Sequence, residues 1–544
     1  MRNRTWYATV VLALLMALPL LTPAGGQHTA LKPEFQTSDR CLACHNGLTT
    51  PSGEDVSIGL AWRAGMMANS SRDPYWQASV RRESLDHPES QPAIEDECSI
   101  CHMPMARYEA HLQGRKGEIF SHLPFGPDKN KKDDKLAEDG VSCSLCHQIG
   151  KEKLGTRESF VGGFVIDPPV SKDNHPEYGP FQIQKGQQRI MHTSSGGFQP
   201  TDAAHIGDSA LCGTCHTLYT TARGAGGKEI GRLPEQTPYQ EWLHSDYRDK
   251  TSCQSCHMPE VQGVAPVTAV LGELREGVHR HTFVAANFFM LRMLNQYRQD
   301  LSVQALSQEL TTASEQTVTF LQSQSARVSL RNIDAASSSG RLQLQVEVEN
   351  LTGHKLPTAY PSRRAWLHLL VQDRNGQKVF ESGALNPDGS IQGNDNDADP
   401  LRYEPHYREI NSSDQVQIYE SIIKDQNGHV TTGLLAGVGY LKDNRLLPNG
   451  FQKQTAEPDI RVIGDAADDP NFTETGDMVR YSVPLSDAQG PFHIDAELWY
   501  QPIGFRWAHN LGPYNAAEPR RFVRYYDSMS SATAVMLAHA SATH

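Results

Sequence analysis

The pattern of apolar and polar residues changes twice along the 544-residue chain. Residues 41–281 alternate short helical stretches with loops rich in Gly, Pro and charge, and one helix is expected to begin with Asp73 as its N-cap and Pro74 at its first position. Residues 286–326 then carry apolar residues at helical spacing. From Arg327 the period becomes two, as in LQLQVEVEN, which predicts strands with one buried face.

This pattern predicts an α+β multidomain protein. The domain that ends near residue 285 should be mostly helix and loop, and the β region should form an antiparallel sandwich. The predicted parts are, in chain order, a signal peptide (1–26), the first domain (27–285), a helical connector (286–326), the β-sandwich (327–510) and a C-terminal helix or tail (511–544).

Residues 1–26 have the features of a signal peptide. Arg2 and Arg4 precede an apolar run at residues 6–21, and small residues follow at 24–26. The run is shorter than the roughly 20 apolar residues that span a bilayer, so cleavage is expected and a retained anchor is the alternative. No later stretch is apolar enough to cross a membrane. The mature protein is therefore expected to be soluble, and periplasmic or extracellular.

All ten cysteines belong to five copies of one motif, Cys-x-x-Cys-His. This is the attachment motif of c-type haem, in which two thiols one helical turn apart bind one porphyrin and the adjacent imidazole reaches the iron. Disulfides and zinc sites are the alternatives, but five complete motifs with no cysteine left over favour haem. The predicted covalent residues are Cys41, Cys44, Cys98, Cys101, Cys143, Cys146, Cys212, Cys215, Cys253 and Cys256, and the predicted proximal iron ligands are His45, His102, His147, His216 and His257.

Each haem iron has a second axial position, and its occupant separates an electron carrier from a catalyst. The candidate distal ligands are His192, His205, His244, His281, His111, Met66, Met67 and His354. The first four lie inside or just beyond the haem segment. His354 lies in the turn TGHKLPT of the β region, so it would reach a haem across the domain boundary. For each candidate, a surface or core position is the alternative.

Acidic residues suggest one further ion site. In GNDNDADP, Asp395, Asp397 and Asp399 offer oxygens at every second position, as calcium requires. The segment lacks the glycine and the final Glu of an EF-hand loop, and a solvated turn is the alternative. It is a weak calcium candidate.

The net charge of −13 argues against a nucleic-acid partner. Haem propionates would make the loaded protein more acidic still. Its redox partners are therefore expected to present a basic or neutral face.

Several segments resemble one known family. These are WRAGMMANSSRDPYW, CHMPMARYEA, CHMPE, MHTSSGGF, LCGTCHTLYT, PYQEWLHSDY and HTFVAANFFMLRML. They are similar to multihaem cytochromes c of the class that includes the tetrahaem carrier of ammonia oxidation. The resemblance implies closely packed haem pairs, mostly with two histidine ligands, that relay electrons. NLTGHKLPTAYPSRRAW resembles a C-terminal region found in some of these proteins.

Motifs and resemblance together predict a secreted pentahaem c-type cytochrome that relays electrons between a donor and an acceptor protein. A membrane-bound or outer-membrane complex is one option for the partner. No catalytic residue is predicted. Two alternatives remain: a multihaem oxidoreductase whose open-site haem acts on a small nitrogen or sulfur compound, and a structural subunit of a cytochrome filament or complex.

The five complete motifs predict five covalent haems. The intact mass of the acid-denatured mature protein should therefore exceed that of the processed polypeptide by five haem masses. A smaller increment in a fully matured sample would mean that at least one motif does not bind haem.

Overall fold

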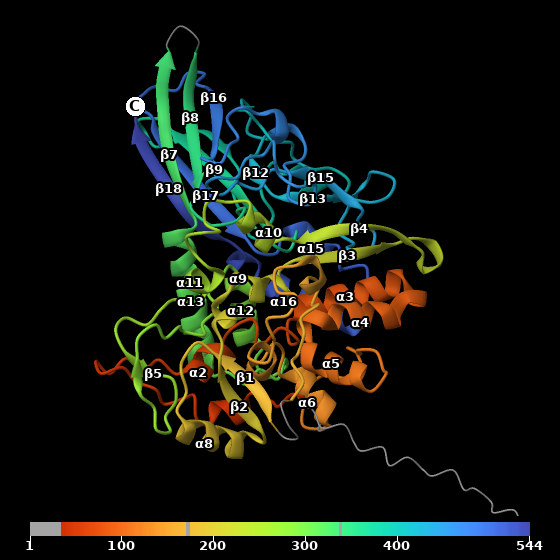
Figure 1. Cartoon of the computed structure of the whole chain (residues 1–544). Coiled ribbons are helices and arrows are strands. Elements are labelled where there is room, and N and C mark those ends of the chain that lie inside the picture. The colour runs from red at the N-terminus through yellow and green to blue at the C-terminus, as the bar shows by residue number, and fades with distance from the viewer. Residues whose placement is uncertain (1–33, 130, 170–173, 337–339) are drawn as a thin grey trace, which may run out of the picture. The chain divides into compact units, whose positions relative to one another are not determined.

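Helices and loops make up most of the part of the chain that carries the motifs (Figure 1). The computed structural model describes residues 34–544 apart from residue 130 and residues 170–173 and 337–339, so the predicted signal peptide lies outside the described residues. The helices of this part are α1 (Asp39–Leu42), α2 (Ile58–Arg63), α3 (Pro74–Asp86), α4 (Gln91–His102), α5 (Pro104–Leu112), α6 (Lys132–Glu138), α7 (Cys143–Cys146), α8 (Lys185–Ser195), α9 (Ser209–Gly213), α10 (Pro238–Leu243) and α11 (Cys253–His257).

Helix α3 begins as the sequence predicts. Pro74 is its first residue, and the carboxylate of Asp73 accepts hydrogen bonds from the backbone N–H groups of Tyr75 and Trp76 at 2.8 and 3.2 Å. The helix then buries Trp76 and Val80 in a core cluster that it shares with α4 to α7.

Three two-stranded sheets also lie in this part of the chain, where only helices and loops were predicted. β1 (His175–Gly179) pairs with β2 (Phe198–Asp202) in parallel, whereas β3 (Leu218–Arg223) pairs with β4 (Glu229–Gln236), and β5 (Ala265–Pro266) with β6 (Leu274–Arg275), in antiparallel register. Most of these strands are short and partly exposed, so they leave no clear alternation in the sequence.

Two helices occupy the predicted connector. They are α12 (Phe288–Gln296) and α13 (Ser307–Gln324). Phe288, Phe289, Met293 and Leu294 of α12 are fully buried, which explains the apolar spacing of this stretch.

Two larger sheets follow. One has the strand order β11 (Glu409–Ile410), β16 (Asp477–Pro484), β8 (Arg341–Asn350) and β7 (Ala326–Ala336). The other has the order β10 (Lys378–Ser382), β9 (Arg364–Gln372), β17 (His493–Gln501) and β18 (Val535–Thr543), with β12 (Ile418–Tyr419) also pairing with β9. Their pairs are antiparallel except β11 with β16, which is parallel. A smaller sheet contains β14 (Val430–Thr431), β13 (Ser421–Lys424) and β15 (Gly439–Asp443).

Strand β8 shows why the alternation predicted a strand with one buried face. Leu342, Leu344, Val346 and Val348 are at most 2% exposed, and the Gln and Glu residues between them are partly exposed. Buried residues of both larger sheets belong to one hydrophobic cluster. Helices and sheets are thus both present, as the α+β class requires.

The C-terminal segment differs from its prediction. A C-terminal helix or tail was expected at residues 511–544, and the structure has α16 (Ala517–Ser528) followed by the strand β18. Val535 and Leu537 are buried, and β18 pairs with β17 along nearly its whole length. Backbone pairing at the sheet edge therefore decides the conformation of a segment that has ordinary helix formers.

The hydrophobic core does not stop where the composition changes. Ala64, Tyr75 and Ala78, from the part that carries the motifs, belong to the same buried cluster as Leu294 of α12 and the strands of the larger sheets. Residues Phe35–His544 accordingly form one compact unit. Within the described residues, no helix combines the length and apolar character that a membrane crossing needs.

Replacing Leu294 by Ala tests whether this shared core melts as one unit. Leu294 is fully buried, so the cavity should lower the free energy of unfolding by about 2–5 kcal/mol. The melting temperature should fall equally in far-ultraviolet circular dichroism and in visible absorption. The control is Gln296→Ala on the exposed side of the same helix, which should leave both unchanged. A shift in only one of the two signals would mean that the two parts of the chain unfold separately.

Candidate haem sites

The second motif ends helix α4, and the other four motifs lie in or beside helices of one turn. Three thiol pairs also bring different motifs together. The thiols of Cys41 and Cys143, of Cys101 and Cys215, and of Cys212 and Cys253 are hydrogen-bond partners. The first, second and fifth motifs therefore each contact the third or fourth motif.

Four motif histidines are held by a hydrogen bond from Nδ1 to a backbone carbonyl. The acceptors are Val267 O for His45 at 2.6 Å, Ser70 O for His102 at 2.8 Å, Tyr178 O for His147 at 2.5 Å and Val284 O for His257 at 2.6 Å. A carbonyl only accepts, so Nδ1 carries the proton and Nε2 is left with its lone pair, which is the form of imidazole that binds a metal. No feature of the sequence identifies these four carbonyls.

Desolvation lowers the pKa values of the motif imidazoles and so favours their neutral form. It lowers the pKa of His102 to about 4, and burial followed by the charge of His257 does the same for His216. Desolvation likewise lowers the pKa values of His45, His147 and His257. A neutral imidazole is the ligand that iron requires.

Two motif histidines each face a second histidine. The ring centres of His147 and His281 are 6.3 Å apart with their planes inclined by 18°, and those of His257 and His354 are 6.2 Å apart with an inclination of 8°. In both second histidines Nδ1 again lies beside a carbonyl, at 3.1 Å for His281 and 2.9 Å for His354. Burial, and then the facing histidine, lowers their pKa values to about 3 and about 4.

These separations fit an iron bound between each pair. A metal–imidazole bond is about 2 Å long and a ring nitrogen lies about 1 Å from the ring centre, so two axial imidazoles have ring centres about 6 Å apart. Rings in direct contact lie closer, as Trp76 does to His102 at 4.3 Å. The donor set of this chain therefore fits haem with two histidine ligands at two of the five motifs.

Three other candidate distal ligands use Nε2 elsewhere. Nε2 of His111 lies 2.7 Å from Asp96 Oδ1, that of His205 lies 2.8 Å from Ile149 O, and that of His244 lies 3.1 Å from Gln452 O. The structure does not place these three as ligands, because the nitrogen that would bind iron is already in a hydrogen bond. The position of these histidines near a motif in the sequence did not reveal their Nε2 hydrogen bonds.

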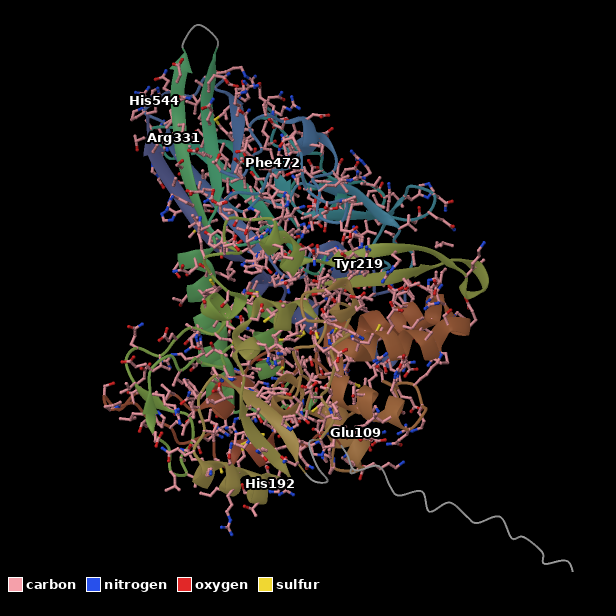
Figure 2. All side chains as sticks on the ribbon, viewed as in Figure 1. Glu109, His192, Tyr219, Arg331, Phe472 and His544 are labelled. Carbon is pink, nitrogen blue, oxygen red and sulfur yellow. The ribbon has the colours of Figure 1, made fainter. Side chains whose placement is uncertain are left out.

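The remaining candidates lie in different settings. His192 is on α8 (Figure 2), a helix without a fully buried residue, whose Gln187 side chain donates to Leu271 O at 3.1 Å. Met66 packs against the main hydrophobic cluster, and Met67 O accepts a hydrogen bond from Val141 N. None of the described contacts of Met66 or Met67 is with a motif histidine.

The structure does not support the calcium site predicted at residues 395–399. Arg364 binds both oxygens of Asp397, at 2.7 and 2.9 Å. Asp395 pairs with Arg402, and Asp399 accepts a hydrogen bond from Leu401 N. Each carboxylate is thus used by a cation or by the backbone, so their oxygens do not converge on an ion.

His406, Asp469 and Asp477 form a buried group of possible metal ligands. Nδ1 of His406 lies 2.8 Å from the amide nitrogen of Gln417 and 3.1 Å from that of Asn444, and both amide oxygens accept backbone N–H groups. The amides are therefore fixed as donors, which makes Nδ1 the acceptor and leaves the proton on Nε2, toward the two carboxylates. This tautomer donates to a carboxylate and does not bind a metal there.

A buried ionic cluster holds the loop that carries His354. Arg445 contacts Glu241 of α10 at 2.9 Å and Asp443 at 2.7 Å, and Lys355 contacts Asp443 at 2.8 Å and donates its backbone N–H to Glu241. Although burial raises the pKa of Asp443, the charges of Arg445 and Lys355 lower it to about 2. The cluster thus connects α10, between the fourth and fifth motifs, to the residue next to His354.

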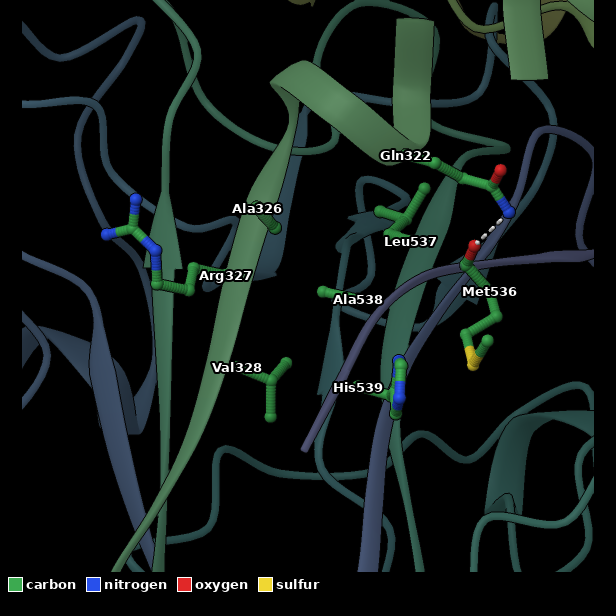
Figure 3. Close-up of a pocket in the computed structure, with 8 residues that line it drawn as sticks. All are labelled: Gln322, Ala326, Arg327, Val328, Met536, Leu537, Ala538 and His539. Carbon is green, nitrogen blue, oxygen red and sulfur yellow. Dashed lines mark hydrogen bonds between the residues drawn. The ribbon is translucent and has the colours of Figure 1, made fainter. Parts of the chain in front are cut away.

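Two cavities of the described residues are lined by neither of these histidine pairs. One of about 330 Å³ opens between β7 and β18, where Gln322 donates to Met536 O (Figure 3). Another of about 200 Å³ is lined by His111 and Tyr108. Neither is lined by a motif histidine.

No protein-family model and no curated protein matches the chain. Among solved structures, it matches the crystal structure of a penta-haem cytochrome c552 from Thermochromatium tepidum. The TM-score is 0.51 and the sequence identity 13%, over 94% of this chain and 100% of that one. The chain shares the fold of a pentahaem c-type cytochrome. At this identity the likeness concerns the fold, and the ligand geometry above is the independent evidence from this chain.

Replacing Arg445 by Met tests the buried ionic cluster. The substitution leaves Glu241 and Asp443 with one cation fewer in a site where their side chains are at most 3% exposed, so it should cost about 3–5 kcal/mol of unfolding free energy. The control is Arg327→Met, which removes an arginine that is 65% exposed and should cost about 0–1 kcal/mol. Equal losses in denaturant unfolding would contradict this role of the cluster.

Proposed function

We propose that the chain is a secreted pentahaem c-type cytochrome that relays electrons between protein partners. The proposal rests on two pairs of facing imidazoles, His147 with His281 and His257 with His354. The ring centres of each pair lie at the spacing of two axial ligands. The five motifs supply the covalent attachment, and the shared fold with a pentahaem cytochrome c552 agrees with that number.

The chain's own residues suit electron transfer. Covalently bound haem supplies the iron that changes oxidation state. Nδ1 hydrogen bonds fix the orientation of both imidazoles in each pair, and desolvation lowers their pKa values and so favours the neutral rings. An iron with both axial positions filled by fixed rings offers no place for a substrate and needs little rearrangement when its charge changes.

Contacts between motifs support a relay. The three thiol pairs that join different motifs would bring neighbouring haems close together, as transfer from one haem to the next requires. His281 serves the third motif and His354 the fifth. His192 is our candidate for the first motif, because α8 contacts the loop that also holds His45.

The β region has a structural part in this proposal. We propose that its two larger sheets form a sandwich, since they share one buried cluster, and that it delivers His354 to the fifth motif. The N-terminal apolar run supports export to the periplasm or the outside of the cell, and the net charge of −13 supports basic or neutral partners.

Electron paramagnetic resonance of the oxidised protein tests the ligand pairs. His281→Ala and His354→Ala should each convert one haem from low to high spin, because each empties one axial position. His244→Ala and His111→Ala are the matched controls and should leave the spectrum unchanged, because their Nε2 atoms are hydrogen-bonded elsewhere.

Two outcomes would contradict the proposal. An unchanged spectrum in His354→Ala would remove the β region from the ligand set. A full-occupancy high-spin haem in the unmodified protein that shifts on addition of nitrite or hydroxylamine would favour the oxidoreductase alternative.

A further inference from the structure

Arg363 is a cation without an anionic partner among the described residues. Its side chain donates to Thr358 O at 3.0 Å and to Asn287 Oδ1 at 3.1 Å, and both acceptors are neutral. The neighbouring Arg364, in contrast, binds both oxygens of Asp397. A guanidinium has five N–H donors in a fixed fork, and this fork matches the shape of a carboxylate. The remaining donors of Arg363 therefore suit an anion.

Tyr500 presents a second unused polar group in the same region. The residue is 1% exposed, and its hydroxyl has no hydrogen-bond partner among the described residues. Burial raises the pKa of Tyr500 to about 12, and the positive charge of Arg363 opposes that rise. The hydroxyl thus lies within electrostatic range of Arg363. A buried hydroxyl without a partner is destabilising, so it points to a further binding partner.

The sheet and helix α12 bring the two side chains together. Tyr500 of β17 lies opposite Ala365 of β9. Side chains alternate between the two faces of a strand, so Arg363, which directly precedes β9, lies on the same face as these two residues. Arg363 contacts Asn287, and the ring centre of Tyr500 lies 6.3 Å from that of Phe288. The guanidinium and the tyrosine therefore meet at the start of α12.

Asn287 connects this place to the fifth motif. Val284, three residues earlier, accepts the hydrogen bond from Nδ1 of His257 at 2.6 Å, and its backbone N–H donates to His257 O at 3.1 Å. The charge of Arg363 also acts on His354, which faces His257. Burial first and then His257 lower the pKa of His354, and Arg363 adds to the lowering.

Thr358 connects the same place to the fourth motif. The carbonyl of Thr358 accepts from Arg363, and its hydroxyl donates to Glu241 of α10 at 2.6 Å. The first turn of α10 donates a backbone N–H to His216 O at 3.4 Å. The charge of Arg363 contributes to the low pKa of His216, after burial and the charge of His257. Arg363 therefore lies near the proximal histidines of two motifs.

We propose that Arg363 and Tyr500 bind a propionate of the haem on the fourth or the fifth motif. A propionate is a carboxylate, which accepts two N–H bonds from a guanidinium and one further bond from a hydroxyl. The positive charge of Arg363 also favours the reduced form of the nearby haem, because reduction removes one positive charge from the iron. The inference rests on the covalent haems of the proposed function, and it names residues that bind one of them and raise its potential.

A redox titration of the haem-loaded chain, followed by electron paramagnetic resonance, tests this site. Arg363→Gln should shift one haem about tenfold toward its oxidised form, which lowers its potential by about 59 mV. Arg363→Lys keeps the charge and should have a smaller effect. Tyr500→Phe changes no charge, yet it should lower the same potential because it removes a hydrogen bond to the propionate. The low-spin signal that disappears in His354→Ala identifies the fifth haem, and so distinguishes the two motifs.

Matched controls lie in the β region. Arg327→Gln removes the charge of an arginine that is 65% exposed. Tyr481→Phe removes another buried hydroxyl without a partner among the described residues, on β16. Both controls should leave every haem potential unchanged. Arg363→Lys and Tyr500→Phe carry the test if Arg363→Gln does not load haem.

Equal potentials in the Arg363 and Tyr500 variants and in the unmodified chain would overturn the propionate site. A shift confined to haems of the first three motifs would overturn it as well. In both cases the electron-transfer function stands if all five haems remain covalently bound and low-spin. A mature chain without covalent haem would instead overturn the function itself.

Discussion

The fifth motif depends on charges that are buried together. Glu241, Asp443, Lys355 and Arg445 have side chains that are at most 8% exposed, and an isolated charge there would be strongly destabilising. Each is acceptable only because the others are present with good geometry. Since Glu241 belongs to α10 and the other three to the β region, this requirement fixes how the two parts meet, and it fixes the loop that brings His354 opposite His257.

Which nitrogen of an imidazole carries the proton likewise depends on the group beside it. A backbone carbonyl beside Nδ1 determines the tautomer, and the other nitrogen becomes available to a metal. His281 and His354 meet this condition, whereas His111, His205 and His244 present Nε2 to an acceptor. His406 shows the reverse arrangement, in which donors beside Nδ1 place the proton on Nε2. Nδ1 of His509 also lies beside a carbonyl, so the position opposite a motif histidine is what distinguishes His281 and His354.

The sequence predicted what is local and periodic. The attachment motifs, the N-cap at Asp73 and the alternation of β8 each depend on residues close in the chain, and they could be read from spacing. The facing pairs could not, because His354 lies 97 residues from His257 and its approach depends on contacts that only the folded chain makes. Proximity in sequence favoured His244, whose Nε2 lies beside Gln452 O, and composition favoured calcium where Arg364 has already bound Asp397.

The shared core has a consequence for how the protein matures. The cluster joins Ala64 to Leu537, so its contacts span almost the whole chain, and contacts of such long range form slowly. All five motifs precede residue 258, well before the last strand of the sheet at Val535–Thr543. The cysteines are therefore synthesised before the strand that completes the shared core.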